Sequence, residues 1–240
     1  MKRQFLLIAI FAIGLFACNK SDTTTPDNSL TTTPETKAQY NNTSFGVYKG
    51  VVIGSTGTII FRINNGDNVV KGFLTIDDIK DTLSTTQTVT AGQALSNVNF
   101  AGRISSMTIS ANANGNNASL TNIRINGHSN VTGFIVHENS TKQVYCYEGA
   151  LSGNRTGTFN CTRVGANNGD TAYVLAKVIN DSTIYRGFGQ VNNNSTTFNL
   201  YPSQASTCVI QGNFSGNAFT GSWTWTNTYG SGTFACTRTY

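Results

Sequence analysis

Residues 219–226 read Phe-Thr-Gly-Ser-Trp-Thr-Trp-Thr, in which aromatic residues or glycine alternate with hydroxyl residues. Large apolar side chains, including Trp223 and Trp225, fall on one face of an extended chain, and hydroxyl side chains fall on the other. Successive side chains of a β-strand point to opposite faces of its sheet, so this order predicts a strand with one buried face. Shorter runs with the same period recur between residues 45 and 240. We therefore expect half-buried antiparallel strands along this whole region.

The pattern after residue 45 predicts an all-β fold. No segment there sustains the 3.6-residue period of an amphipathic helix. Glycine and asparagine separate the apolar runs at a spacing of roughly 8–12 residues, which is typical of meanders. We expect an antiparallel meander that forms one or two barrels or sandwiches after a disordered N-terminal tether.

The N-terminus has the three parts of a signal peptide. Lys2 and Arg3 precede an unbroken apolar run at residues 5–17. As a helix this run rises only about 20 Å, which is too short for a hydrocarbon core of roughly 30 Å. We therefore expect residues 1–17 to be a cleaved signal peptide rather than a membrane span.

The run closes with Leu15-Phe16-Ala17-Cys18, which resembles the lipobox of bacterial lipoproteins. The resemblance implies cleavage before Cys18, diacylglycerol on its sulfur and a further acyl chain, such as palmitate, on the new N-terminus. Two or more acyl chains make membrane attachment stable. Asn19 replaces the aspartate that resembles an inner-membrane retention signal, which favours the outer membrane. Residues 18–44, rich in threonine, asparagine and proline, are expected to form a flexible tether.

An internal repeat predicts two related modules. The stretch Gly153–Arg163 returns as Gly216-Asn217 followed, after an inserted strand, by residues 232–238. We expect a first β module at residues 45–164 and a second at 165–240, which can also form one continuous fold.

Four cysteines remain beside Cys18, and an exported setting favours disulfides. A two-residue turn at Gly153-Asn154 would place Cys146 directly opposite Cys161, at a separation that suits a disulfide. By analogy, Cys208 would pair with Cys236. Unpaired buried thiols and pairing between the modules are the alternatives. The absence of a C-x-x-C pair argues against zinc.

Composition excludes several functions. Charged residues make up 11% of the chain and form no basic stripe, so nucleic-acid binding is not expected. No phosphate-binding loop, dinucleotide fingerprint or nucleophile elbow is present, so neither a cofactor nor catalysis is expected. His128 and His137 are the only histidines, and His137 is interpreted as a solvated loop residue rather than a metal ligand.

Carboxylates supply the remaining catalytic hypothesis. Asp77, Asp78 and Asp81 follow a strand, and we interpret them as strand-end residues facing water, with calcium binding or acid–base chemistry as the alternatives. Glu138 and Glu148 are two of the three glutamates, and a pair of this kind is what a glycoside hydrolase uses. Hydrolysis is the third hypothesis for function.

The aromatic residues near the C-terminus provide a candidate binding site. The glycine-rich runs around residues 48–61 resemble the meanders of calycin-like and lipocalin-like bacterial lipoproteins, which implies a barrel with an internal cavity. Trp223, Trp225 and Tyr229 are then either core residues or the lining of a site for a sugar or an apolar molecule.

Four Asp-Ser/Thr pairs resemble the O-glycosylation sequon of some bacterial envelope proteins. They make the following hydroxyl residues candidates for modification: Thr23, Thr82, Thr171 and Ser182.

These observations predict an envelope lipoprotein, anchored in the outer membrane, whose β domain is a non-catalytic binding module for a small apolar molecule or a glycan. The alternative is a structural or surface-coat lipoprotein without a small ligand. An internal cavity lined by aromatic residues would favour binding, a solid core would favour a structural role, and converging carboxylates would favour the hydrolase.

Overall fold

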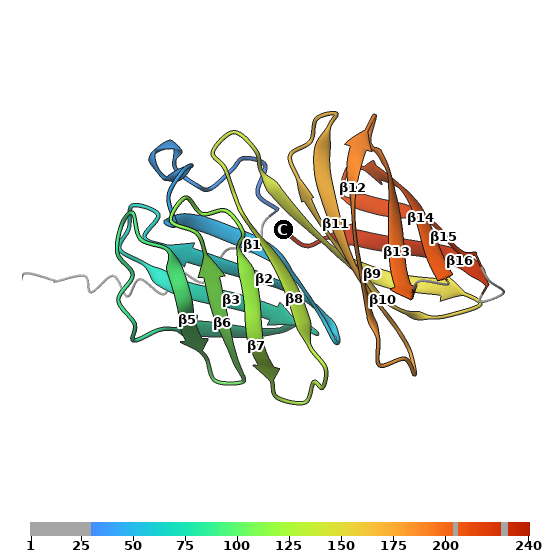
Figure 1. Ribbon diagram of the computed structural model, residues 1–240, viewed down its shortest axis with the longest axis horizontal. Coiled ribbons are helices and arrows are strands. Elements are labelled where there is room, and N and C mark those ends of the chain that lie inside the picture. The colour runs from blue at the N-terminus through green and yellow to red at the C-terminus, as the bar shows by residue number, and fades with distance from the viewer. Residues whose placement is uncertain (1–29, 204–205, 227–229) are drawn as a thin grey trace, which may run out of the picture.

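The structure is a computed structural model that describes residues 30–203, 206–226 and 230–240. Two antiparallel sheets of eight strands each lie side by side (Figure 1), which confirms the prediction of an all-β antiparallel fold. One short 3-10 helix, η1 (Ala38–Tyr40), precedes them. The strands are β1 (Gly46–Ile53), β2 (Thr56–Ile63), β3 (Val70–Ile76), β4 (Ile79–Ser84), β5 (Leu95–Ala101), β6 (Ser105–Ala111), β7 (Ser119–Ile125), β8 (Thr132–His137), β9 (Val144–Gly153), β10 (Gly157–Val164), β11 (Asp170–Val178), β12 (Ile184–Asn192), β13 (Ser195–Ser203), β14 (Ser206–Ser215), β15 (Ala218–Trp225) and β16 (Ser231–Arg238).

The first barrel contains β1–β8 in the order β7-β6-β5-β4-β3-β2-β1-β8. Its edge strands β7 and β8 lie beside each other (Figure 1), and Leu120 and Ile123 of β7 pack against Gly133 of β8. Phe61 and Phe100 meet edge to face inside, with ring centroids 4.9 Å apart. Side chains from all around the sheet therefore share one apolar core.

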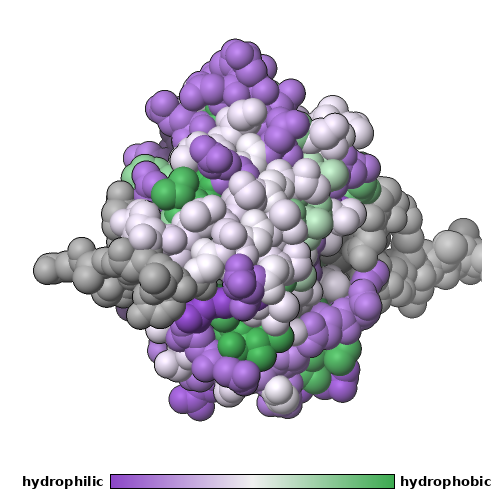
Figure 2. All heavy atoms as spheres, turned by 90° about the vertical axis from the view of Figure 1, so that its right-hand side faces the viewer, coloured by the Kyte–Doolittle hydropathy of each residue, from purple (hydrophilic) through white to green (hydrophobic). Residues whose placement is uncertain are grey.

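The second barrel, β9–β16, is closed by hydrogen bonds because β9 pairs with both β10 and β16. Strand β15 contains residues 219–225, whose alternation predicts a strand with one buried face. Phe219 and Trp223 are buried in the barrel, whereas Ser222 and Thr224 are exposed. The outer face that points away from the first barrel is correspondingly hydrophilic or intermediate in hydropathy, with a few separate hydrophobic patches (Figure 2).

Asparagine shapes many of the turns. Every described non-glycine residue with a positive φ is asparagine or aspartate. Asn193 and Asn194 form the two-residue turn between β12 and β13, and Asp77 and Asp78 form the turn between β3 and β4. Positive φ at both central positions gives a type I′ turn, whose twist matches that of the adjoining strands. Asp77 and Asp78 therefore have a structural role as turn residues.

The two barrels meet along a surface that we call the seam. Strand β1 is buried at every position, because one of its faces lines the first barrel and the other packs against the second. The apolar part of the seam consists of Val47, Val51, Ile53, Ile60, Cys146, Leu175 and Tyr240. The C-terminus lies between the barrels (Figure 1), and the Tyr240 side chain is part of their contact.

The module boundary differs from the predicted one. Strands β9 and β10, at residues 144–164, belong to the second barrel, so the boundary falls at residues 138–143 rather than at 164. Both copies of the repeat therefore lie within one barrel. The two copies end in β10 and β16, and both of these strands pair with β9 to close the barrel. The repeat therefore does not correspond to two separate modules.

The predicted disulfides are absent, and all four described cysteines are free and buried. Gly153 stays in strand β9 and pairs with Gly232, so the β9–β10 register differs by one residue from that of a Gly153-Asn154 turn. Cys146 consequently lies opposite Thr162 instead of Cys161. A one-residue shift moves a side chain to the other face of a sheet. Cys146 thus points into the seam and Cys161 into the barrel.

The second proposed pair fails for a different reason. Cys208 lies opposite Trp225 on β15, whereas Cys236 lies opposite Phe219 on the same strand. Six residues of a strand span about 20 Å. A disulfide requires Cα atoms within roughly 7 Å, so these two cysteines are far too distant.

The predicted tether ends earlier than residue 44. Thr36 and Ser44 are buried, and the backbone N–H of Glu35 donates to Glu138 Oε2 at 2.7 Å. The Thr36 side-chain oxygen accepts a hydrogen bond from the Val47 N–H at 3.0 Å. Residues 30–44 therefore form a docked segment, because a few specific polar contacts hold a sequence that has little apolar surface.

Candidate functional site

The interior of the second barrel does not contain a ligand cavity within the described residues. Trp223 is buried, and its indole N–H donates to the carbonyl oxygens of Ser152 and Thr233 at 3.1 and 3.2 Å. Trp225 packs edge to face on Tyr185. The space beside both tryptophans is about 10 Å³, no more than one water molecule needs. Trp223 is a core residue, Trp225 is half-buried and packs against the same core, and Tyr229 lies outside the described residues.

A larger cavity lies at the seam. It has a volume of about 400 Å³ and opens between strands β2–β4 of the first barrel and the β9 and C-terminal segments of the second. We call it the seam groove. Its lining is Leu30, Thr56, Thr58, Ile60, Phe73, Leu74, Thr75, Asp77, Asp78, Lys80, Asp81, Thr82, Glu148, Arg238, Thr239 and Tyr240.

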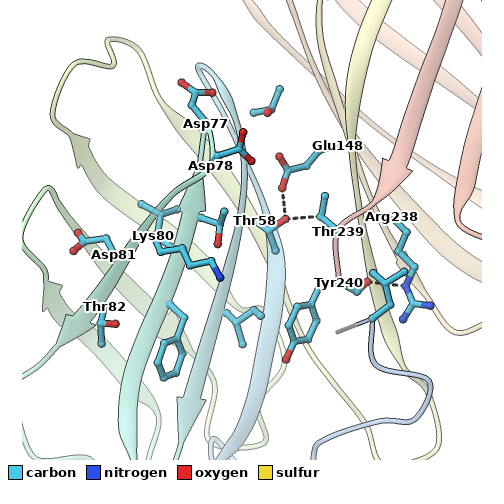
Figure 3. Close-up of a pocket in the computed structure, with 16 residues that line it drawn as sticks. Thr58, Asp77, Asp78, Lys80, Asp81, Thr82, Glu148, Arg238, Thr239 and Tyr240 are labelled. Atoms are coloured by element: carbon cyan, nitrogen blue, oxygen red, sulfur yellow. Dashed lines mark hydrogen bonds between the residues drawn. The ribbon is translucent and has the colours of Figure 1, made fainter. Parts of the chain in front are cut away.

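Hydrogen-bonding groups enter this groove from both barrels (Figure 3). Asp78 and Lys80 point into it from the β3–β4 hairpin, and Glu148 points into it from β9. Thr58 of β2 bonds Glu148, and its hydroxyl lies 2.8 Å from that of Thr239. Neither Asp78 nor Lys80 has an ion pair among the described residues, and both are exposed. They are available to a ligand.

The pKa of Glu148, which faces the groove, is raised. Burial raises its pKa, the nearby Asp77 charge raises it further, and hydrogen bonds with Thr58, Thr56 and Thr239 lower it by less. The net pKa lies above the ordinary value of 4.5. The groove thus combines a carboxyl group that holds its proton more strongly with one exposed carboxylate, Asp78, that has no ion pair among the described residues.

A buried ion cluster fixes the wall of the groove that carries Tyr240. Lys49 Nζ lies 2.7 Å from Glu138 Oε1 and 3.1 Å from Glu35 Oε1. Glu35 also pairs with Arg62 and accepts a hydrogen bond from the Tyr240 hydroxyl at 2.6 Å. The cluster therefore joins the docked N-terminal segment, the first barrel, the link between the barrels and the C-terminal residue.

The predicted carboxylate pair Glu138 and Glu148 is not brought together as a site. Glu138 is completely buried and accepts hydrogen bonds from Lys49 and from the backbone of residues 35, 36 and 144. Glu148 faces the seam groove with Asp77 and Asp78. His137 bonds the Phe45 carbonyl oxygen at 2.8 Å, so it is a partly buried structural residue rather than a solvated one.

The aspartates of three predicted glycosylation sequons stabilise turns. Asp81 accepts hydrogen bonds from Ser105 and from two backbone N–H groups, Asp170 pairs with Lys142, and Asp181 accepts from the Tyr185 hydroxyl. Among the hydroxyl residues that follow them, Thr82 and Ser182 are exposed and Thr171 is half-buried. Thr82 also lines the seam groove. Thr23 and Cys18 lie outside the described residues.

Within the described ranges, no cluster of histidine, cysteine, aspartate or glutamate is arranged to hold a metal ion. The same part of the chain has no helix with the length and hydrophobicity that crossing a membrane requires.

Several groove residues were not identified from the sequence. Lys80, Arg238 and Tyr240 belong to different barrels or to the chain terminus, and they meet only because the barrels dock. The period-two pattern gives the face of each residue within its own sheet. It contains no signal for contacts between sheets, so this site was not predictable from it.

Comparison with known proteins adds no assignment, because no family model, curated protein or solved structure matches the chain.

Proposed function

We propose that this chain is a membrane-anchored envelope lipoprotein that binds a glycan in the seam groove. The observation that supports this proposal is the contrast between the two candidate sites. The barrel interior beside Trp223 has space for about one water molecule, whereas the seam groove has about 400 Å³ and a polar lining. The site therefore suits a hydroxyl-rich ligand better than a small apolar one.

The chemistry of the groove supports a sugar in particular. A sugar ring presents hydroxyl groups around its edge, each of which donates and accepts hydrogen bonds. Asp78 supplies acceptors, Lys80 supplies donors, and the Thr58 and Thr239 hydroxyl groups supply both. Hydrogen bonds to charged groups contribute more than neutral ones, about 1.5–3 kcal/mol each.

The anchor in this proposal is lipid on Cys18. The docked segment at residues 30–44 leaves residues 18–29 between the anchor and the fold. Twelve residues span at most about 40 Å even when fully extended. The binding domain would then operate close to the membrane surface. Mass spectrometry of the protein from its native host tests the anchor, because Cys18→Ser removes the expected lipid mass and releases the chain from the membrane.

Calorimetric titration with a panel of envelope and plant oligosaccharides tests glycan binding. We expect at least one to bind, and Lys80→Ala to weaken its binding about tenfold or more, because a charged hydrogen-bond donor is lost. Lys177→Ala is the matched control, since Lys177 lies on β11 away from the groove. Absence of binding across the panel, or equal loss in both variants, would favour the structural alternative.

One observation favours a hydrolase as a second candidate. The pKa of Glu148 is raised, and Asp78 lies across the same groove with no ion-pair partner among the described residues. A protonated carboxyl group facing a carboxylate is the arrangement that glycoside hydrolases use. Chromatography of a bound oligosaccharide after long incubation distinguishes the two: recovery of the intact sugar supports binding alone, and new reducing ends that disappear in Glu148→Gln support hydrolysis.

Glycosylation at Thr23, Thr82, Thr171 or Ser182 remains a proposal that rests on the sequon resemblance. The exposure of Thr82 and Ser182 supports these two positions over half-buried Thr171. An intact mass equal to that of the unmodified lipoprotein, measured on material from the native host, would end it.

A further inference from the structure

Three aromatic side chains form a row across the outside of the seam. Phe134 of β8 stacks on Tyr173 of β11, with ring centroids 4.3 Å apart and planes inclined by 30°. Phe188 of β12 lies directly opposite Tyr173 in the β11–β12 register. Directly opposite residues have Cβ atoms about 5 Å apart on the same face of a sheet. We call Phe134, Tyr173 and Phe188 the aromatic row.

The outer end of this row is unusually exposed. The Phe188 side chain is 74% exposed, more than the other large exposed hydrophobic residues of the described chain. Phe188 lies opposite Tyr173, and the neighbours of Tyr173 in β11, Ala172 and Val174, line the barrel interior. Phe188 therefore points outward and belongs to neither barrel core. A contiguous apolar surface marks a binding site better than a single exposed residue does, and Phe188 extends the aromatic surface that Phe134 and Tyr173 begin.

A second groove begins beside the row. It has a volume of about 700 Å³ and lies between Phe134, Tyr173 and the loop of residues 112–117, whose sequence is Asn-Ala-Asn-Gly-Asn-Asn. We call it the asparagine groove. The Asn112, Asn116 and Asn117 side chains are exposed, and no hydrogen bond among the described residues uses their amide groups. The Tyr173 hydroxyl is likewise without a partner in the described part of the chain.

The loop holds these amides on a fixed backbone. Asn112 and Asn116 are joined by a backbone hydrogen bond of 2.9 Å, and Gly115 donates to the Asn112 carbonyl oxygen at 2.9 Å. Gly115 has a φ of 82° and lies so close to His137 that a side chain there would collide with the imidazole ring. The loop is therefore seated on the first barrel, and its free amides extend from a rigid base.

The charge of the groove selects among ligands. Its lining contains no lysine, arginine, aspartate or glutamate, and His137 is its single titratable group apart from Tyr173. Burial lowers the pKa of His137, which keeps the ring neutral near pH 7. Arg186, two residues from Phe188 on β12, bonds the Thr132 hydroxyl. A charged ligand thus finds no counter-charge in the lining, whereas a neutral polyhydroxyl ligand finds free donors and acceptors.

From these contacts we propose that the aromatic row and the asparagine groove form a second site, for a neutral glycan chain. Sugar rings would stack on Phe188 and Tyr173, because the C–H face of a pyranose is apolar and complements an aromatic ring. The hydroxyl groups at the ring edge would bond the free amides of Asn116 and Asn117. The site uses different residues from the seam groove and does not depend on it.

Titration of the mature chain with neutral hexasaccharides of glucose, mannose and xylose tests this site. Phe188→Ala is expected to weaken binding of the preferred hexasaccharide about tenfold or more, and Phe188→Trp to retain it. Ile179→Ala is the matched control, because Ile179 is also a highly exposed apolar residue next to the β11–β12 hairpin. Asn116→Ala is expected to weaken binding, since an amide that bonds a sugar hydroxyl is removed.

The outcome is independent of the seam groove. Lys80→Ala should leave affinity at the second site unchanged, and Phe188→Ala should leave affinity at the seam groove unchanged. The proposal is overturned if no neutral hexasaccharide binds, or if Phe188→Ala binds as tightly as the native chain. Self-association that Phe188→Ala abolishes, with no saccharide binding, would assign the aromatic row to a protein contact instead.

Discussion

Lys49 and Glu138 form an ion pair that is completely enclosed where the two barrels meet. The ammonium nitrogen lies 2.7 Å from the carboxylate oxygen, and neither side chain has any exposed surface. Glu138 belongs to the link between the barrels, and Lys49 lies in the middle of β1. A buried pair of this kind contributes little net stability when intact, but the loss of one partner leaves an uncompensated charge.

Lys49→Met should therefore destabilise the chain by about 3–5 kcal/mol. Denaturant unfolding followed by tryptophan fluorescence measures the free energy of unfolding. Lys177→Met is the control, and its effect should stay within about 0.5 kcal/mol, as is usual for a surface position. The double variant Lys49→Met/Glu138→Gln should be more stable than Lys49→Met alone. A small effect of the single change would contradict an enclosed pair.

Glu35 should make the protein less stable in acid. Burial raises its pKa, but the charges of Lys49 and Arg62 and the hydrogen bonds from Tyr240 and Lys49 together lower it by more. The net pKa of Glu35 is therefore below the ordinary value of 4.5. A lowered folded-state pKa contributes stability above the unfolded value, and this stability is lost as the pH falls through the folded value. Between pH 6 and 3, Glu35→Gln should thus lose less stability than the native chain does. Parallel pH profiles of the two proteins would contradict the cluster.

Glu148 should have the opposite dependence. Because its folded-state pKa is raised, its contribution is fully present below about pH 4.5 and is lost as the pH rises through the folded value. Glu148→Gln, which remains neutral, should therefore gain stability relative to the native chain as the pH rises from 4 to 7. Thermal unfolding across this range measures the difference. A constant difference at every pH would show that burial does not perturb this carboxyl group.

The four cysteines of the second barrel should react as free thiols only after unfolding. Burial raises the pKa of Cys146 to about 12 and that of Cys208 to about 11, which suppresses the reactive thiolate. Iodoacetamide without reductant should add no label to these residues in the native protein and four labels in denaturant. If these four cysteines took up no label in denaturant, both predicted disulfides would be present. Two labels instead of four would indicate one disulfide.

The sequence predicted the strands better than their partners. Alternation around Trp223 gave the correct buried face, since a strand with one apolar face has one way to bury it. The register at Gly153 was wrong by one residue, because this glycine pairs with Gly232 on a strand almost eighty residues away. That single shift removed the Cys146–Cys161 disulfide. Long-range pairing of this kind leaves no trace in the local pattern.

The candidate site was predictable only in fragments. Asp77, Asp78 and Glu148 stood out as carboxylates, and the structure places all three on one groove. Lys80 and Tyr240 gave no signal, because their role depends on how two barrels dock. The tryptophans were predicted to be either core residues or the lining of a site, and the barrel beside them has space for about one water molecule. A pattern of apolar residues does not distinguish a packed barrel from a hollow one.

An NMR map of the glycan-binding surface tests whether the seam groove binds a glycan. A backbone-assigned sample is titrated with the oligosaccharide that binds best, and the amide shifts are followed. Binding in the seam groove predicts saturable shifts concentrated at residues 56–58, 77–82 and 238–240, which Lys80→Ala weakens and Lys177→Ala leaves unchanged. Shifts confined to the barrel interior around Trp223, or no saturable shifts with any glycan, would contradict the claim.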